Sequence, residues 1–101
     1  MAMSKQQWFT FAVDHPAFPG HFPDDPMVPG ALLLDHAMGV ATAMLGTDRP
    51  ALRSAKFLRP LRPGAPCHLR LETRRGGGYN LTCRSAGALL ISAVIDAQAQ
   101  P

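Results

Sequence analysis

Residues 20–35 of the chain read GHFPDDPMVPGALLLD, and this stretch decides the fold. Its first half is rich in proline, which fixes φ and removes a backbone donor. Its second half is apolar and begins at Pro29-Gly30. This pair suits the first turn of a helix, because proline already has a helical φ. The stretch therefore predicts a rigid loop that runs directly into a helix.

The predicted helix covers residues 30–45 and is apolar on almost every side. Only Asp35, His36 and Thr42 interrupt it, and Gly46 is a suitable C-cap. A helix of this kind must be buried on most of its surface. A chain of 101 residues buries only about 60–65% of its unfolded surface. We therefore expect a second chain to help cover this helix.

The regions on either side have the composition of strands. Residues 7–13 (QWFTFAV) are strand formers, and they end at Asp14-His15-Pro16. After the helix, apolar positions recur with a period of two, so that Leu69 and Leu71 share one face. Further strands are predicted at residues 51–61, 67–74, 79–85 and 88–97.

These elements predict an antiparallel α+β fold in a single domain over residues 1–101. The order is one strand, an ordered loop at 14–29, one buried helix and four strands in a meander. Gly76-Gly77-Gly78 and Ala86-Gly87 supply two of the turns. We expect the sheet of about five strands to curl around the helix.

Composition excludes several classes of protein. The net charge is +3, and the basic residues of the second half have only Phe57 and Tyr79 as aromatic neighbours, which argues against nucleic-acid binding. No apolar run approaches the 18 or so residues that cross a bilayer. Cys67 and Cys83 lack metal-ligand spacing and a secretory context, so we expect reduced core cysteines in a cytoplasmic protein without a metal.

Two side chains near the helix start carry the chemistry. His21 and Asp35 form a candidate acid/base pair in an apolar setting. The N–H of Gly30 lacks an intrahelical partner and lies at the positive end of the helix, so it can stabilise a developing negative charge. We expect Asp35 to be desolvated by the apolar helix and to hold its proton longer than a surface aspartate.

The ordered motif resembles the hotdog-fold β-hydroxyacyl-[acyl-carrier-protein] dehydratases, which share a His-Phe-x-x-x-Pro-x-x-Pro-Gly loop leading into a central helix. The matching residues here are His21-Phe22-Pro23, Pro26, Pro29-Gly30, Leu34-Asp35 and Ala37-Met38. The segment 56–64, KFLRPLRPG, is similar to the family's second signature. The resemblance spans about residues 8–97 and implies a dimer of hotdog chains.

Details of the sequence point to branches of that family. Asp35 is similar to the branch that also isomerises the double bond, since ordinary dehydratases have glutamate there. The start of the motif, residues 14–23, is similar to small dehydratases of aryl-polyene and related pigment clusters. Gly39-Val40 departs from the family, which places a glutamine just after Ala-Met.

The resemblance implies dehydration of a 3-hydroxyacyl thioester on acyl carrier protein to the trans-2-enoyl thioester, in fatty-acid or polyene synthesis. His21 would be the base for the C2 proton, Asp35 of the other subunit the acid for the 3-hydroxyl, and Gly30 the oxyanion donor. No cofactor is implied beyond the carrier's phosphopantetheine. The expected acyl-binding residues are Phe22, Pro29, Ala31, Leu33, Met38 and Phe57, and the expected carrier-binding residues are Lys56, Arg59 and Arg62.

Two other functions stay open at this point. In a hotdog thioesterase, Asp35 would activate water to attack the thioester carbonyl. A non-catalytic hotdog subunit would bind acyl carrier protein or an active partner, as a homodimer or heterodimer. Of the other histidines, we expect His15 to order the loop, His36 to pack or face the partner subunit, and His68 to be a solvated strand residue.

Overall fold

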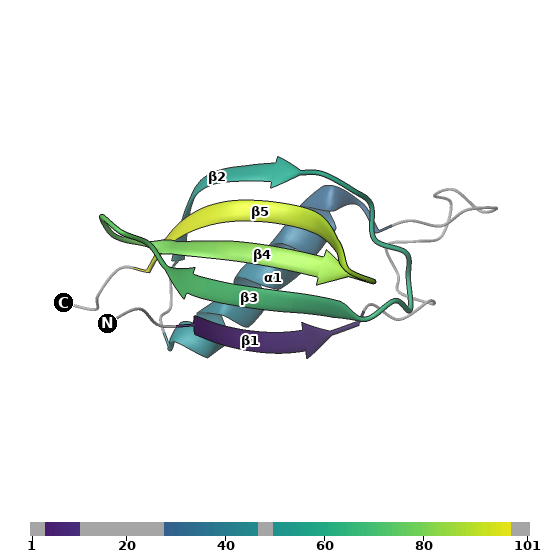
Figure 1. Cartoon of the computed structure of the whole chain (residues 1–101), viewed down its shortest axis with the longest axis horizontal. Helices are drawn as coiled ribbons and strands as arrows, with labels where there is room; N and C mark the ends of the chain where they lie inside the picture. The colour runs from purple at the N-terminus through teal and green to yellow at the C-terminus, as the bar shows by residue number, and fades with distance from the viewer. Residues whose placement is uncertain (1–3, 11–27, 47–49, 98–101) are drawn as a thin grey trace.

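One helix lies across one face of a five-stranded antiparallel sheet (Figure 1). This computed structural model describes residues 4–10, 28–46 and 50–97. In chain order the elements are β1 (Ser4–Phe9), α1 (Gly30–Leu45), β2 (Pro50–Phe57), β3 (Cys67–Thr73), β4 (Tyr79–Ser85) and β5 (Ala88–Ala97). The predicted α+β class, the helix and the last two strands are confirmed, and β3 ends one residue before the expected limit.

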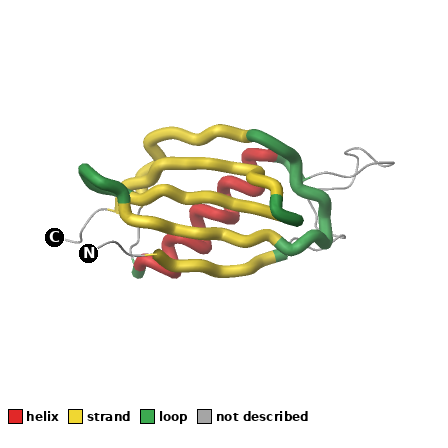
Figure 2. The backbone as a smooth tube through the Cα atoms, in the orientation of Figure 1, coloured by secondary structure: helices red, strands yellow, loops and turns green. Residues whose placement is uncertain are grey.

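The strand order is β1-β3-β4-β5-β2, so the predicted four-strand meander is wrong for β2. Strands β3, β4 and β5 do form consecutive hairpins, but β2 pairs with β5 and lies at the far edge from β3. The segment 58–66, visible in Figure 2 as the long loop at one end of the sheet, joins β2 to β3. Its three prolines cannot donate to a strand ladder. This segment therefore suits a crossover connection better than a tight hairpin turn.

Two predicted strand limits also differ from the structure. β1 begins at Ser4 and ends at Phe9, and residues 11–13 of the prediction lie outside the described part of the chain. β1 begins with polar residues, so its first half has no apolar alternation from which a strand could be predicted. β2 ends at Phe57, and Leu61 instead forms an isolated bridge with Val28. Pro60, which lacks an N–H, separates the two.

The core lies between the inner face of the sheet and α1. Leu69 and Leu71 are fully buried there, as their alternation predicts. Cys67 and Cys83 are free and fully buried beside them, which confirms reduced core cysteines. The hydrogen bond to the Cys67 sulfur, together with burial, raises the pKa of Cys83 well above its ordinary range. The same hydrogen bond lowers the pKa of Cys67, and because both thiols are fully buried, neither is a surface group.

The ends of α1 follow the sequence. Pro29 flanks the helix with φ −56° and ψ 140°, and Gly46 closes it in the left-handed region with φ 66°. The Gly46 N–H donates to the Thr42 carbonyl at 3.0 Å. Lys5 of β1 donates from Nζ to the Met44 carbonyl at 2.8 Å, a favourable place for a cation at the helix C-terminus.

The predicted burial of α1 on most sides is not achieved by one chain. Its fully buried residues are Leu33, Ala37 and Ala41, one line at four-residue spacing that faces the sheet. The opposite line of the helix is exposed and consists of Ala31, Asp35, Gly39 and Ala43. A single sheet contacts only one side of a helix, so the remaining surface stays open.

The turn between β4 and β5 allows a test of the backbone strain at an alanine with positive φ. Ala86 and Gly87 both have positive φ, 51° and 80°, as in a type I′ turn, where asparagine is favoured at the first position. We expect Ala86→Asn to raise the free energy of unfolding by about 1 kcal/mol by relieving the left-handed alanine. Urea denaturation measures the change. An unchanged or lower stability would contradict this assignment of the turn.

Candidate functional site

An apolar cavity of about 250 Å³ opens where the start of α1 meets the end of β2. Nine residues line it: Val28, Gly30, Leu33, Phe57, Leu58, Arg59, Pro60, Leu61 and Ile91. Val28, Leu33, Leu61 and Ile91 form its floor, since each is at most 2% exposed. The other five residues are exposed and form its mouth. The cavity is therefore a pit with an apolar floor, and Arg59 is the one charged group among its described lining residues.

Backbone hydrogen bonds hold the walls of this pit in place. The Val28 N–H donates to the Leu61 carbonyl at 2.7 Å, which joins the residue before the helix start to the segment after β2. The N–H groups of Leu58 and Arg59 both donate to the Leu90 carbonyl, at 2.8 and 3.3 Å. The two sides of the pit are thus fixed to each other and to β5.

Glycine at position 30 leaves room for the Phe57 ring as it lies in this structure. A Cβ atom at this position would lie 2.8 Å from Cδ1 of the Phe57 ring. Gly30 is the first residue of α1, and its N–H precedes the first helical hydrogen bond, which the Leu33 N–H donates to the Pro29 carbonyl at 3.0 Å. The helix start therefore presents a backbone donor beside an aromatic wall, at the mouth of an apolar pit.

Asp35 lies on the other side of α1. It follows the buried Leu33 by two residues, a rotation of about 200° around a helix with 3.6 residues per turn. Its side chain is exposed, so the desolvation expected for Asp35 does not occur within one chain. His21 and Phe22 lie outside the described residues, and the pairing of His21 with Asp35 stays a prediction.

The predicted acyl-binding residues divide into two groups. Leu33 and Phe57 line the pit, together with the predicted oxyanion donor Gly30, whereas Pro29 and Ala31 are exposed and lie outside its lining. Met38 is half-buried against the core and does not reach the cavity. Five lining residues are not predicted from the sequence: Val28, Leu58, Pro60, Leu61 and Ile91. Three of these lie within residues 51–61. The prediction of one continuous strand over this range gave no reason to expect a cavity there.

The predicted basic positions differ in their surroundings. Arg59 lies at the mouth of the pit, and Arg62 is exposed on the segment that follows. Lys56 is exposed and pairs in register with Ser92, which places its side chain on the sheet face away from α1. The three residues therefore do not form one compact cluster.

The other histidines are engaged in contacts. The ring of His36 packs on Phe9 with centroids 4.6 Å apart, in agreement with a packing role. His68 is half-buried, lies 4.7 Å from the Trp8 ring and donates from Nε2 to Gln6 Oε1 at 2.7 Å. His68 is thus a strand residue on the outer face, as expected, and it is partly rather than fully solvated because Trp8 and Gln6 contact it. His15 lies outside the described residues.

Within residues 4–10, 28–46 and 50–97, no three His, Cys, Asp or Glu side chains are grouped so that they could hold a metal ion. The one helix in these ranges, α1, is too short to span a bilayer.

This fold is the hotdog architecture, and solved dehydratases share it. The dehydratase heterocomplex ApeI:P from Xenorhabdus doucetiae superposes with a TM-score of 0.72, covering 95% of this chain and 92% of that chain at 19% identity. The (R)-hydratase from A. caviae gives a TM-score of 0.63 over 96% of both chains at 20% identity. The family model described as ApeI-like (ApeI dehydratase) matches residues 3–92. The chain belongs to this ApeI-like dehydratase family.

Curated relatives agree with this assignment. The 3-hydroxyacyl-[acyl-carrier-protein] dehydratase FabZ of Pseudoalteromonas translucida is 38% identical over 72 residues, which are 59% of this chain and 47% of the relative. FabZ of Dinoroseobacter shibae is 30% identical over 98 residues, 86% of this chain and 60% of the relative. The chain thus spans about half to three fifths of the length of these relatives.

Truncation of the cavity floor tests the packing of the site. Leu33 is 1% exposed, and Leu58 at the mouth is 51% exposed. We expect Leu33→Ala to lower the free energy of unfolding by about 2–3 kcal/mol, the lower part of the range for buried leucines, because one side of Leu33 already borders a cavity. Leu58→Ala is the matched control and should change it by less than about 1 kcal/mol. Equal losses in chemical denaturation would contradict the division into floor and mouth.

Proposed function

We propose that this protein removes water from a 3-hydroxyacyl thioester on acyl carrier protein and forms the trans-2-enoyl thioester, in fatty-acid or polyene synthesis. The observation that carries the proposal is the apolar pit that opens beside the Gly30 N–H, which has no partner among the described residues, in a chain of a dehydratase family. An acyl chain fits the apolar floor, and a thioester oxygen fits the helix start.

The reaction needs a base, an acid and an oxyanion donor. His21 takes the C2 proton, the C2–H electrons form the C2–C3 double bond, and the C3–O bond breaks. Asp35 gives its proton to the departing hydroxyl, which leaves as water. The Gly30 N–H stabilises the enolate-like thioester oxygen. Acid/base catalysis of this kind contributes about 10²–10⁴-fold, and one oxyanion donor about 10²–10³-fold.

The proposed site is shared between two hotdog chains. Asp35 points away from the pit of its own chain, so it serves a site whose other groups come from a second chain. β2 is an edge strand, and Leu52, Phe57 and Leu58 on or beside it are exposed apolar residues suited to an interface. His21 of one subunit then faces Asp35 of the other. The second chain is another copy or a related hotdog subunit, and the ApeI:P heterocomplex supports the latter arrangement.

The pit sets limits on the substrate and its carrier. Its volume of about 250 Å³ is below the range of about 300–1,000 Å³ for pockets that bury a drug-sized ligand. One chain therefore accommodates only part of a long acyl group. Arg59, with Lys56 and Arg62, contacts the acidic carrier protein or its phosphopantetheine arm. The enzyme uses no other cofactor and acts in the cytoplasm.

A non-catalytic hotdog subunit is the second candidate function. Gly39 lies one turn after Asp35 on the exposed line of α1, and a Cβ atom there would meet nothing within 4 Å. No side chain at position 39 therefore holds the Asp35 carboxylate in place, although a catalytic carboxylate needs such a neighbour. In this case the chain would complete the site of an active partner without turning over substrate itself.

Substitution of the two catalytic groups tests the proposed reaction. We expect His21→Ala and Asp35→Asn each to lower the hydration rate of a trans-2-enoyl carrier-protein thioester by at least about 10²-fold. The loss of enoyl absorbance measures this rate. Asp96→Asn, which makes the same change as Asp35→Asn on the sheet face away from α1, is the control. Unchanged rates in the first two variants would refute the mechanism, and release of free thiol by the wild type would indicate a thioesterase.

Mixing the two inactive variants tests whether the site is shared. If chains exchange, co-expressed His21→Ala and Asp35→Asn form mixed dimers in which one site carries both substitutions and the other carries neither. We expect activity to recover to about a quarter of the wild-type value for a two-site dimer. No recovery in demonstrated mixed dimers would show that each chain supplies its own acid and base.

A further inference from the structure

Three side chains of types that are common in binding surfaces lie in a row on the sheet face away from α1. The register pairs Trp8 with His68 and His68 with Arg84, so the three residues lie side by side on β1, β3 and β4. Their chain neighbours, such as Cys67 and Cys83, face the core. The row therefore belongs to the outer face, and none of its members takes part in the proposed chemistry.

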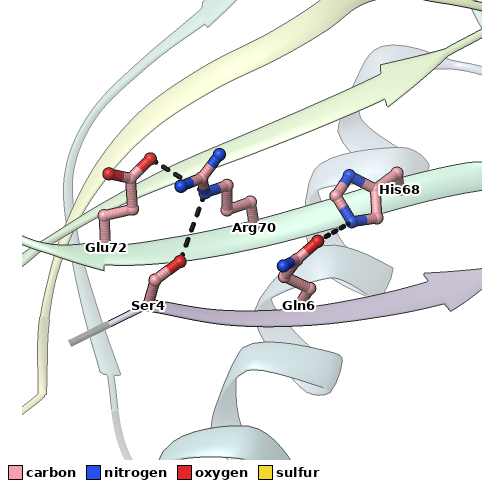
Figure 3. A network of polar contacts seen from close by, with 5 residues as sticks. All are labelled: Ser4, Gln6, His68, Arg70 and Glu72. Carbon is pink, nitrogen blue, oxygen red and sulfur yellow. Dashed lines mark hydrogen bonds and ion pairs between the residues drawn. The ribbon is translucent and has the colours of Figure 1, made fainter.

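Contacts within the sheet hold His68 and Trp8 of this row in place. His68 Nε2 donates to Gln6 Oε1 at 2.7 Å (Figure 3). The Trp8 ring packs against the imidazole with centroids 4.7 Å apart. Arg70, in the next row, donates from Nε to Ser4 Oγ at 3.2 Å and forms an ion pair with Glu72 at 3.1 Å. The side chains held in this way, Trp8 and His68 among them, lose less conformational entropy when they bind a partner.

The unpaired charge on this face is positive. Its carboxylates, Glu72 and Asp96, are each in an ion pair with an arginine. Arg84 is exposed and makes no hydrogen bond or ion pair with the part of the chain that the structure describes. Lys56 lies on the same face and has no such contact either. An acidic partner would therefore be complementary to this face.

The row has the composition of a protein-binding hot spot. Trp8 is 65% exposed, the largest exposure among the large hydrophobic residues described. Tryptophan and arginine are enriched among the residues that carry binding energy in protein interfaces. A single-stranded nucleic acid would need successive aromatic platforms, whereas Trp8 is the only tryptophan of the chain. Two copies of this face would bring Arg84 against like charge, which disfavours self-association.

The row lies at the same end of the sheet as the mouth of the pit. Cys83, the neighbour of Arg84, and Phe57 both pair with Ile91 of β5. Arg84 on β4 is thus two strand spacings, about 10 Å, from β2 at the mouth. A small protein seated on the row can also reach the rim of the pit.

We propose that Trp8, His68 and Arg84 form the docking surface for the acidic carrier protein that delivers the substrate. This proposal rests on the proposed function and names where the body of the carrier sits. Arg59 at the mouth then meets the carrier's prosthetic arm, while Arg84 pairs with a carboxylate of the carrier and Trp8 is covered by an apolar side chain.

Charge reversal on the row tests the docking surface. We expect Arg84→Glu and Trp8→Ala to weaken binding of holo acyl carrier protein by about tenfold or more. In the wild type, carrier binding should change Trp8 fluorescence, and salt should weaken it. The matched control is Arg75→Glu, which makes the same charge change in the β3–β4 hairpin at the other end of the sheet. It should bind like the wild type.

Kinetics separate this proposal from the proposed function. With a carrier-bound substrate, Arg84→Glu should lower kcat/KM about tenfold or more, and with the same acyl group on free pantetheine it should leave kcat/KM unchanged. If Arg84→Glu and Trp8→Ala bind the carrier like Arg75→Glu, the docking surface is refuted. If the wild type turns over neither substrate, the proposed function fails, and the binding measurement still decides the docking surface.

Discussion

The close packing of α1 on the sheet is the constraint on which the rest of the structure depends. Ala37 and Ala41 have no exposed surface, and as small residues they let the helix lie near the strands. Leu33, one turn earlier, fills the wider space toward the helix start. The helix backbone therefore approaches β2 so closely at Gly30 that a methyl group would overlap the Phe57 ring. The pit and its donor exist because of this approach.

The same packing explains why one chain alone does not bring the groups of the proposed reaction together. A helix that buries one narrow line against a sheet must expose the opposite line, and Asp35 lies on that line. The proposed oxyanion donor and the proposed acid therefore face opposite sides of one helix. In the proposed dimer, a second chain would cover the exposed apolar surface and bring its own pit to Asp35.

The sequence predicted the helix and the hairpins well because their signals are local. Pro29, Gly30 and Gly46 mark the helix ends through their own backbone preferences. The position of β2 depends instead on a pairing between distant segments, and a contiguous sequence pattern contains no signal for it. The pit shows the same limit, since Ile91 reaches it only through the pairing of β5 with β2. His68 likewise had no local signal for its contacts with Trp8 and Gln6.

The two faces of the sheet have separate roles that follow from strand alternation. Residues facing α1 supply an apolar core and the floor of the pit, and their neighbours in sequence form the outer face. Arg84 follows Cys83 directly, so a core thiol and a surface cation are one residue apart. A charge reversal at Arg84 consequently changes the outer surface without entering the core. Each face can therefore vary in sequence while the other retains its packing.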